Sequence, residues 1–146
     1  MSIWTPGTTL EGIVAYQRGT MVEHLGIVLT ELGPDFIRGT MRATERTIQP
    51  MGILHGGASV VLAETLGSCA SNSTIDRQTR ACVGQEINAN HLRPVPLGGL
   101  VTGTARPIHL GATSKVWGIE LRNEAGKLTC ISRLTMAIIA RRPAAP

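Results

Sequence analysis

Residues 57–73 read GASVVLAETLGSCASNS and contain no proline. Small or apolar residues recur there at steps of three and four, as at Val60, Ala63, Leu66 and Ala70, which is the spacing of one helix face. The stretch predicts one long helix of roughly 25 Å, since each residue adds about 1.5 Å. Its many small side chains allow a sheet to pack closely around it, so we expect a helix buried on most of its circumference.

The segments on both sides of this helix have the patterns of short helices and β-strands. The apolar spacing over residues 10–26 predicts short helices, and residues 27–32 and 36–43 flank a turn sequence and predict a hairpin. After the helix, four segments of period-two or β-branched pattern are expected to follow one another as a meander: 82–92, 100–108, 114–122 and 128–139. This order predicts an α+β domain with an antiparallel sheet of about six strands wrapped around one long central helix.

Length and composition narrow the classes of protein. A chain of 146 residues suits one domain, which we place at residues 1–140 with a frayed tail at 141–146. Only 3% of the residues are aromatic, so we expect an aliphatic core and few stacking platforms for single-stranded nucleic acid. The net charge of +4 is spread along the chain, which favours a small anionic ligand over duplex DNA.

Location and redox state follow from what the sequence contains. The first residues show no signal-peptide pattern, and no apolar run approaches the roughly 18 residues of a membrane span. We therefore expect a cytoplasmic protein without a membrane partner. Cys69, Cys82 and Cys130 have no metal-binding or redox spacing and are predicted to be reduced structural thiols.

The residues best suited to chemistry lie in and just before the long helix. A helix start leaves peptide N–H groups without intrahelical partners, and at Gly56 no side chain blocks the approach of a ligand, so its N–H can stabilise an oxyanion. Gln49 and His55 can donate hydrogen bonds to a carbonyl. Glu64 and Ser68 share one helix face, and Glu64 is the one carboxylate of the helix, a candidate general base or nucleophile.

Each of these residues also has an ordinary structural explanation. A single glutamate in a helix is most often a solvated surface residue, a glycine pair before a helix is most often a turn, and a loop histidine is most often merely packed or exposed. The combination is more specific than its parts, because each element supports one step of carbonyl chemistry.

The run from Gln49 to Ser68, together with residues 84–93 and 108–111, resembles the hotdog-fold acyl-CoA thioesterases of the phenylacetate-pathway type. Among them it is most similar to the 4-hydroxybenzoyl-CoA and 1,4-dihydroxy-2-naphthoyl-CoA hydrolases. The resemblance implies a hotdog homodimer, usually assembled into a homotetramer as a dimer of dimers, with active sites at the dimer interface. It implies no metal and no cofactor, since coenzyme A is part of the substrate.

The resemblance also implies a role for individual positions. Glu64 matches the catalytic carboxylate, acting as nucleophile or as base for water, and Gly56 matches the backbone donor to the thioester oxygen. Gln49 and His55 match residues that orient or polarise this carbonyl, and Ser68 matches a hydroxyl that holds water or the leaving group. The positions that match contacts to CoA are Gly84, His91, Leu92, Arg93, His109, Leu110, Gly111, Ala112, Thr113 and Ser114.

The leading hypothesis is an enzyme that hydrolyses the thioester of aromatic acyl-CoA substrates of hydroxybenzoyl, dihydroxynaphthoyl or phenylacetyl type. One alternative is a hotdog module that binds acyl-CoA without turning it over. Another is a hotdog dehydratase or hydratase, which the absence of any aspartate between Asp35 and Asp76 disfavours. The pathway is left open between menaquinone biosynthesis, degradation of aromatic compounds and housekeeping hydrolysis of CoA esters.

Overall fold

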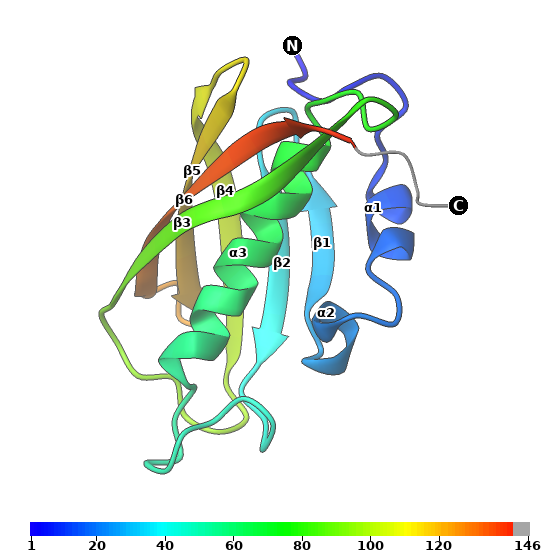
Figure 1. The fold of residues 1–146 in the computed structure, drawn as a ribbon. Coiled ribbons are helices and arrows are strands. Elements are labelled where there is room, and N and C mark those ends of the chain that lie inside the picture. The colour runs from blue at the N-terminus through cyan, green and yellow to red at the C-terminus, as the bar shows by residue number, and fades with distance from the viewer. Residues whose placement is uncertain (142–146) are drawn as a thin grey trace.

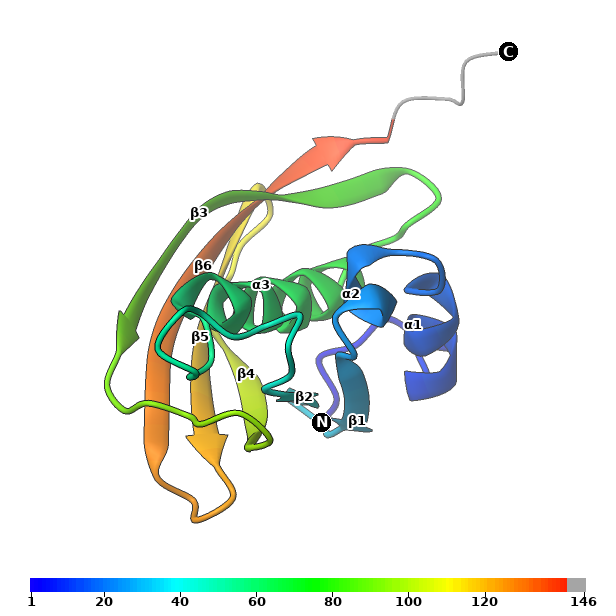
Figure 2. The same ribbon diagram turned by 90° about the horizontal axis from the view of Figure 1, so that it is seen from below.

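A long helix lies against the concave face of one antiparallel sheet in the computed structural model, which describes residues 1–141 (Figure 1). Helix α3 (Gly56–Asn72) matches the predicted helix to within one residue at each end, and 10 of its 17 residues are buried. The sheet curves around it, with α1 (Leu10–Tyr16) and α2 (Met21–His24) on the side of α3 away from β5 and β6 (Figure 2). The expected α+β architecture, a six-stranded sheet around a central helix, is confirmed.

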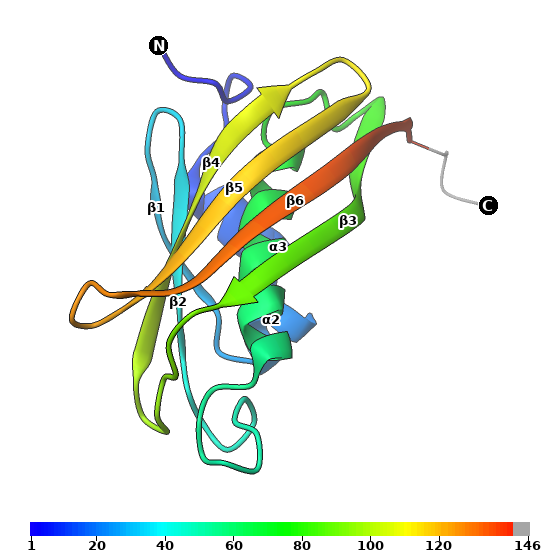
Figure 3. The ribbon, with the colours of Figure 1, turned by 90° about the vertical axis from the view of Figure 1, so that its left-hand side faces the viewer.

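The strands have nearly the lengths that their patterns predicted, and the predicted hairpin of the first two strands is confirmed, but one strand does not lie beside its predicted neighbour. Their bounds are β1 (Val28–Leu32), β2 (Ile37–Arg42), β3 (Arg80–His91), β4 (Leu100–Leu110), β5 (Ser114–Asn123) and β6 (Leu128–Ala140). The order in the sheet is β1-β2-β4-β5-β6-β3. The predicted four-strand meander is therefore wrong for β3, which lies at an edge beside β6 (Figure 3), while β4 to β6 do form a meander.

The connection from β3 to β4 explains this order. It passes the loop that precedes α3, where the Leu54 N–H donates to the Val95 carbonyl at 2.7 Å and the Leu97 N–H donates to the Gly52 carbonyl at 3.0 Å. The chain then reaches β2, because the Gly98 N–H donates to the Ala43 carbonyl at 2.8 Å. These contacts join segments far apart in sequence, so strand patterns alone do not reveal them.

The core is mainly aliphatic, as expected, but its largest buried side chain is aromatic. Trp117 of β5 is fully buried, and its indole N–H donates to the Ser71 hydroxyl of α3 at 2.6 Å. Trp4 stacks on it with ring centroids 6.3 Å apart. This pair ties the N-terminal segment, the helix and the sheet together.

A bulge in β3 decides which of its side chains face α3. The register shifts between Gly84 and Glu86, and one extra residue reverses the alternation of faces along a strand. Cys82 and Gly84 face the helix before the bulge, while Ile87 and its odd-numbered successors face it afterwards.

All three cysteines are buried and free, and burial raises the pKa of the Cys69 thiol to about 12.

Arg141 is fixed to the loop after α3, since its N–H donates to the Thr79 carbonyl at 2.9 Å and its guanidinium to the Arg77 carbonyl at 2.6 Å. The rest of the predicted tail, residues 142–146, lies outside the described residues. In residues 1–141, no helix is both long and apolar enough to cross a membrane.

Candidate active site

The start of α3 is organised by His55, the residue that caps the helix. The His55 N–H donates to the Thr47 carbonyl at 2.8 Å, and its ring Nδ1 accepts a hydrogen bond from the Gly57 N–H at 2.8 Å. An accepting Nδ1 carries no proton, so the neutral ring has its proton on Nε2. His55 is exposed, and its Nε2–H is therefore a donor available to a bound carbonyl.

Gly56 is the first helical residue, and its N–H lies ahead of the intrahelical ladder. Within residues 1–141, no hydrogen-bond acceptor is paired with it. His91 packs against this glycine, because a Cβ on Gly56 would lie 2.9 Å from His91 Nε2. The glycine thus keeps one backbone donor accessible beside an imidazole.

Gly56 and His91 border a cavity of about 340 Å³, which we call the helix-start cavity, whereas His55 adjoins Gly56 in the chain but does not line it. Gln49 also lines it, and the Gln49 Oε1 accepts a hydrogen bond from the Met51 N–H. Because the amide oxygen is engaged, the Gln49 NH₂ group is left as a donor. The helix-start cavity therefore collects donors suited to a carbonyl or an oxyanion.

Glu64 lies in a different and larger cavity of about 680 Å³, which we call the helix-face cavity. Its carboxylate sits against Gly84 of β3, where any Cβ would collide with Oε1. Burial raises the pKa of Glu64 above that of an ordinary glutamate. Ser68 lines the same cavity, and in the part of the chain that is described its hydroxyl makes one hydrogen bond, to the Met136 sulfur at 3.8 Å. A carboxylate of raised basicity and a hydroxyl thus share one face.

The two cavities are separated along the helix. Gly56 and Glu64 are eight residues apart, which is about 12 Å along the axis at 1.5 Å per residue. No residue lines both cavities in the described chain. The structure therefore brings Gln49 and Gly56 to one cavity, with His55 next to Gly56 in the chain, and brings Glu64 and Ser68 to the other cavity. It does not bring the two groups together within one chain.

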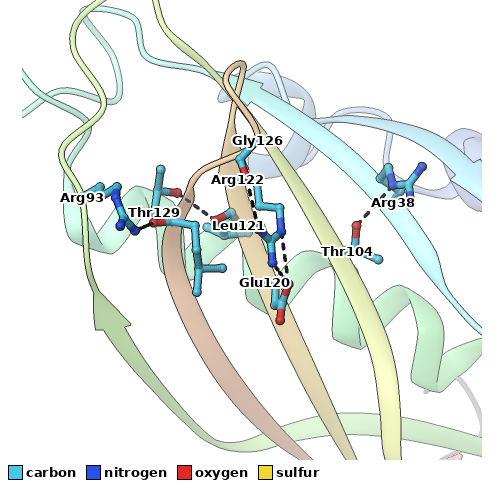
Figure 4. Close-up of polar contacts among 9 residues, drawn as sticks. Arg38, Arg93, Thr104, Glu120, Leu121, Arg122, Gly126 and Thr129 are labelled. Carbon is cyan, nitrogen blue, oxygen red and sulfur yellow. Dashed lines mark hydrogen bonds and ion pairs between the residues drawn. The ribbon is translucent and has the colours of Figure 1, made fainter.

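The residues expected to contact CoA also divide into separate places. His91, Leu92 and Arg93 line the helix-start cavity, and the Arg93 guanidinium donates to the Leu128 carbonyl at 2.7 Å (Figure 4). Gly84 instead lies directly against the Glu64 carboxylate, and we call this position the seat of Glu64.

The turn at residues 109–114 lies at the opposite end of the sheet from His91. Ser114 and Val83 both pair with Ala137 of β6, so the turn lies near the start of β3. Eight residues separate Val83 from His91, which is about 26 Å of strand. Within one chain, the turn and the His91 segment therefore cannot hold the same phosphate.

The N-terminal helices contribute residues that the sequence patterns did not reveal. Ile13 and Tyr16 of α1, with Met21 and Val22 of α2, line the helix-face cavity opposite Glu64. The Arg77 guanidinium lies 4.1 Å from the centroid of the Tyr16 ring and fastens α1 to the loop after α3. Tyr16 and Met21 are exposed in the structure, and the helical spacing of residues 10–26 did not indicate that they border a cavity.

Comparison with known proteins identifies the class to which this fold and site belong. Residues 51–130 match the thioesterase superfamily, and this chain belongs to that family of hotdog-fold hydrolases. The matched range contains α3 and both groups of candidate residues apart from Gln49. The protein is accordingly an enzyme, a thioester hydrolase, and the alternatives of a pure binding module and of a dehydratase fall away.

Relatives of full length support this assignment. The proofreading thioesterase EntH of Cronobacter sakazakii is 50% identical over 137 residues, covering 94% of this chain and 98% of its own. The 1,4-dihydroxy-2-naphthoyl-CoA hydrolase of Escherichia coli K12 is 47% identical over 137 residues, covering 94% and 99%. A crystal structure of a variant of thioesterase PA1618 from Pseudomonas aeruginosa matches with a TM-score of 0.92 and 46% identity, covering 96% of this chain and 100% of that one. The PaaI protein from the phenylacetic acid degradation operon of E. coli has the same fold, with a TM-score of 0.78 and 26% identity over 90% and 96% of the two chains.

Proposed function

We propose that this protein hydrolyses aromatic acyl-CoA thioesters to the free acid and coenzyme A. The observation that carries the proposal is the half-buried Glu64 carboxylate, which contacts Gly84 in a cavity lined by both apolar and polar side chains. Burial raises its pKa, which makes it a stronger base once it is ionised. The relatives' names extend the proposal to aryl substrates, since one acts on 1,4-dihydroxy-2-naphthoyl-CoA.

The reaction needs only groups of the chain and one water. In one route Glu64 takes a proton from water, the hydroxide adds to the thioester carbon, and the C–S bond breaks to release the CoA thiolate, which is then protonated. In the other, the Glu64 carboxylate attacks the same carbon and displaces the thiolate, and water hydrolyses the resulting anhydride. In both, the Gly56 N–H donates to the oxyanion while Gln49 and His55 orient the carbonyl. Ser68 lies where it can hold the attacking water.

We further propose that each site combines two copies of the chain. The distance of about 12 Å along α3 between Gly56 and Glu64 is too long for both to touch one carbonyl. Strand β3 has a free edge beside Gly84, and such an edge is a template for pairing with a second chain. Pairing of two β3 strands would bring the helix-start cavity of one copy toward the helix-face cavity of the other.

A dimer of dimers would use the outer face of the sheet. Ile108 and Ile131 are exposed there, in a hollow of about 570 Å³ that Arg106, Glu120 and Arg133 also line. Apolar side chains surrounded by charges of both signs suit contact between copies. This homotetramer remains a prediction, as does a cytoplasmic location.

The residues that line the two cavities indicate where the acyl group and the CoA part of the substrate bind. The helix-face cavity takes the acyl group, because Met21, Val60 and Val61 give it an apolar part that suits a small aromatic ring, while Arg77, Arg80 and Arg141 also line it. Beside the helix-start cavity, Arg93 supplies positive charge for CoA phosphates and His91 supplies a ring nitrogen for hydrogen bonding. The turn from His109 to Ser114 remains a predicted CoA contact, which in this proposal is to CoA bound at the site of a neighbouring copy. The pathway, whether menaquinone biosynthesis or another, also remains a prediction.

A substrate panel tests the proposal. Thiol release is measured with benzoyl-, 4-hydroxybenzoyl-, phenylacetyl- and 1,4-dihydroxy-2-naphthoyl-CoA, with hexanoyl-CoA as the aliphatic comparison. We expect aryl substrates to have the higher kcat/KM, and Glu64→Gln to reduce kcat by at least about a hundredfold. Glu45→Gln, the same substitution at an exposed position in neither cavity, should retain full activity. Near-normal turnover by Glu64→Gln, or a preference for hexanoyl-CoA, would contradict the proposal.

A further inference from the structure

Asn72, the last residue of α3, extends the stripe of Glu64 and Ser68, since the three residues are spaced four apart on one helix face. All three line the helix-face cavity. The Asn72 carboxamide makes three hydrogen bonds. Its Nδ2 donates to the Ser68 carbonyl at 3.0 Å and to the Cys82 carbonyl at 3.2 Å, and its Oδ1 accepts from the Cys82 N–H at 3.0 Å. Both protons and the oxygen of the side chain are therefore engaged.

The two bonds to Cys82 lie at one point of the β3 edge that faces away from β6. Cys82 lies opposite Ile138 of β6. Its backbone N–H and carbonyl point away from β6, because both are hydrogen-bonded to the Asn72 side chain. The carboxamide thus takes the place of a neighbouring strand at this point of the edge. Within residues 1–141, these are the only hydrogen bonds that join α3 directly to β3.

The seat of Glu64 lies two residues further along β3. Gly84 is in contact with the Glu64 carboxylate, and the bulge follows immediately after Gly84. A bulge is a point where a strand bends readily. The spacing between Gly84 and α3 is therefore set on one side of the bulge by the bridge from Asn72 to Cys82.

We propose that Asn72 is a positioning residue for Glu64: its carboxamide fixes the start of β3 against the last turn of α3 and so holds Gly84 at the distance that orients the Glu64 carboxylate. This inference rests on the proposed function, in which Glu64 acts on the thioester. Asn72 itself touches no reacting atom in this account. Its loss would let β3 move away from the helix and give the carboxylate several orientations in place of one.

The test is the division of the effect between kcat and KM in Asn72→Ala with 4-hydroxybenzoyl-CoA. We expect kcat to fall by about tenfold or more while KM changes by less than about twofold, since small displacements of a reacting group are costly to the chemical step. Gln78→Ala, an exposed residue of the loop between α3 and β3, is the matched control and should have wild-type kcat. If Asn72→Ala does not fold, Asn72→Asp keeps the shape and the acceptor but lacks both donors, and the same fall in kcat is expected of it. Wild-type kcat in the folded variant overturns the proposal.

A double-mutant cycle with Gly84→Ala shows whether Asn72 acts through the seat of Glu64. The added Cβ of that variant pushes on the carboxylate directly, so the two changes disturb the same group. We expect the kcat of the double variant to lie within about threefold of that of the less active single variant. Two changes that disturb the same group do not have multiplying effects on kcat. If the two effects on kcat multiply, the proposal is overturned. It is also overturned if Asn72→Ala has a lower melting temperature but an unchanged kcat for the folded enzyme.

Failure of this inference is distinguishable from failure of the proposed function. If Glu64→Gln is inactive while Asn72→Ala keeps its kcat, the positioning role is wrong and the function stands. If Glu64→Gln retains turnover, the proposed function is wrong, and the positioning role falls with it.

Discussion

Replacing Gly56 by proline removes a single N–H from the proposed oxyanion site and is compatible with the start of helix α3. Gly56 is the first residue of α3, the position at which proline is best tolerated because its N–H has no intrahelical partner. The preceding residue must be extended, and His55 already has φ −66° and ψ 134°. Gly56→Ala is the matched control, because it adds the same Cβ, 2.9 Å from His91 Nε2, and keeps the N–H.

The magnitude follows from what one preorganised donor is worth. Loss of one oxyanion donor costs about 2.7–4 kcal/mol, or roughly 10²–10³ in kcat. We therefore expect Gly56→Pro to have a kcat about a hundredfold below that of Gly56→Ala, measured by thiol release from an aryl-CoA at saturation. Circular dichroism and melting temperature establish that both variants are folded. If folded Gly56→Pro turned over within about threefold of Gly56→Ala, the Gly56 N–H would not be the oxyanion donor.

Three further predictions concern protons and buried hydroxyls. Because burial raises the pKa of Glu64, kcat/KM should fall with decreasing pH through a midpoint above the 4.5 of an ordinary glutamate, and a pH–rate profile with its acid limb at or below that value would contradict the assigned role. Ser132 is buried, and its hydroxyl has no hydrogen-bond partner within residues 1–141, so Ser132→Ala should raise the free energy of unfolding in urea by about 1 kcal/mol. Ser71→Ala should instead lower it by about 1–3 kcal/mol, because the buried Trp117 N–H loses its acceptor; changes of equal sign in the two serine variants would refute the reasoning.

The elements of the fold follow from local pattern, whereas the order of the strands does not. Residues 57–73 predicted α3 because small and apolar residues recur at helical spacing, and the alternating segments predicted strands of nearly the observed length. The place of β3 depends on contacts of residues 94–98 with Gly52, Leu54 and Ala43, which join segments some forty or more positions apart. Such pairings are decided by packing of the whole chain, so no local pattern contains them.

The candidate site shows the same limit. Glu64 and Ser68 could be placed on one helix face from their spacing, and their shared cavity agrees with it. The seat at Gly84 could not, because a bulge in β3 determines which residues face the helix. The sequence also did not indicate that Gly56 and Glu64 lie in two separate cavities. This separation depends on the packing of the helix start against the β3–β4 connection.

The central claim is that one thioester is hydrolysed by Gly56 of one copy and Glu64 of another. Co-expression of differently tagged Gly56→Pro and Glu64→Gln chains tests it most directly, because each chain supplies the group that the other lacks. Random pairing makes half of the dimers mixed, each with one intact site of two, so the account predicts about a quarter of wild-type activity. A chain with both substitutions, co-expressed with Glu64→Gln, is the control and should be inactive. If the Gly56→Pro and Glu64→Gln mixture is no more active than the sum of the two separate variants, the shared site is contradicted.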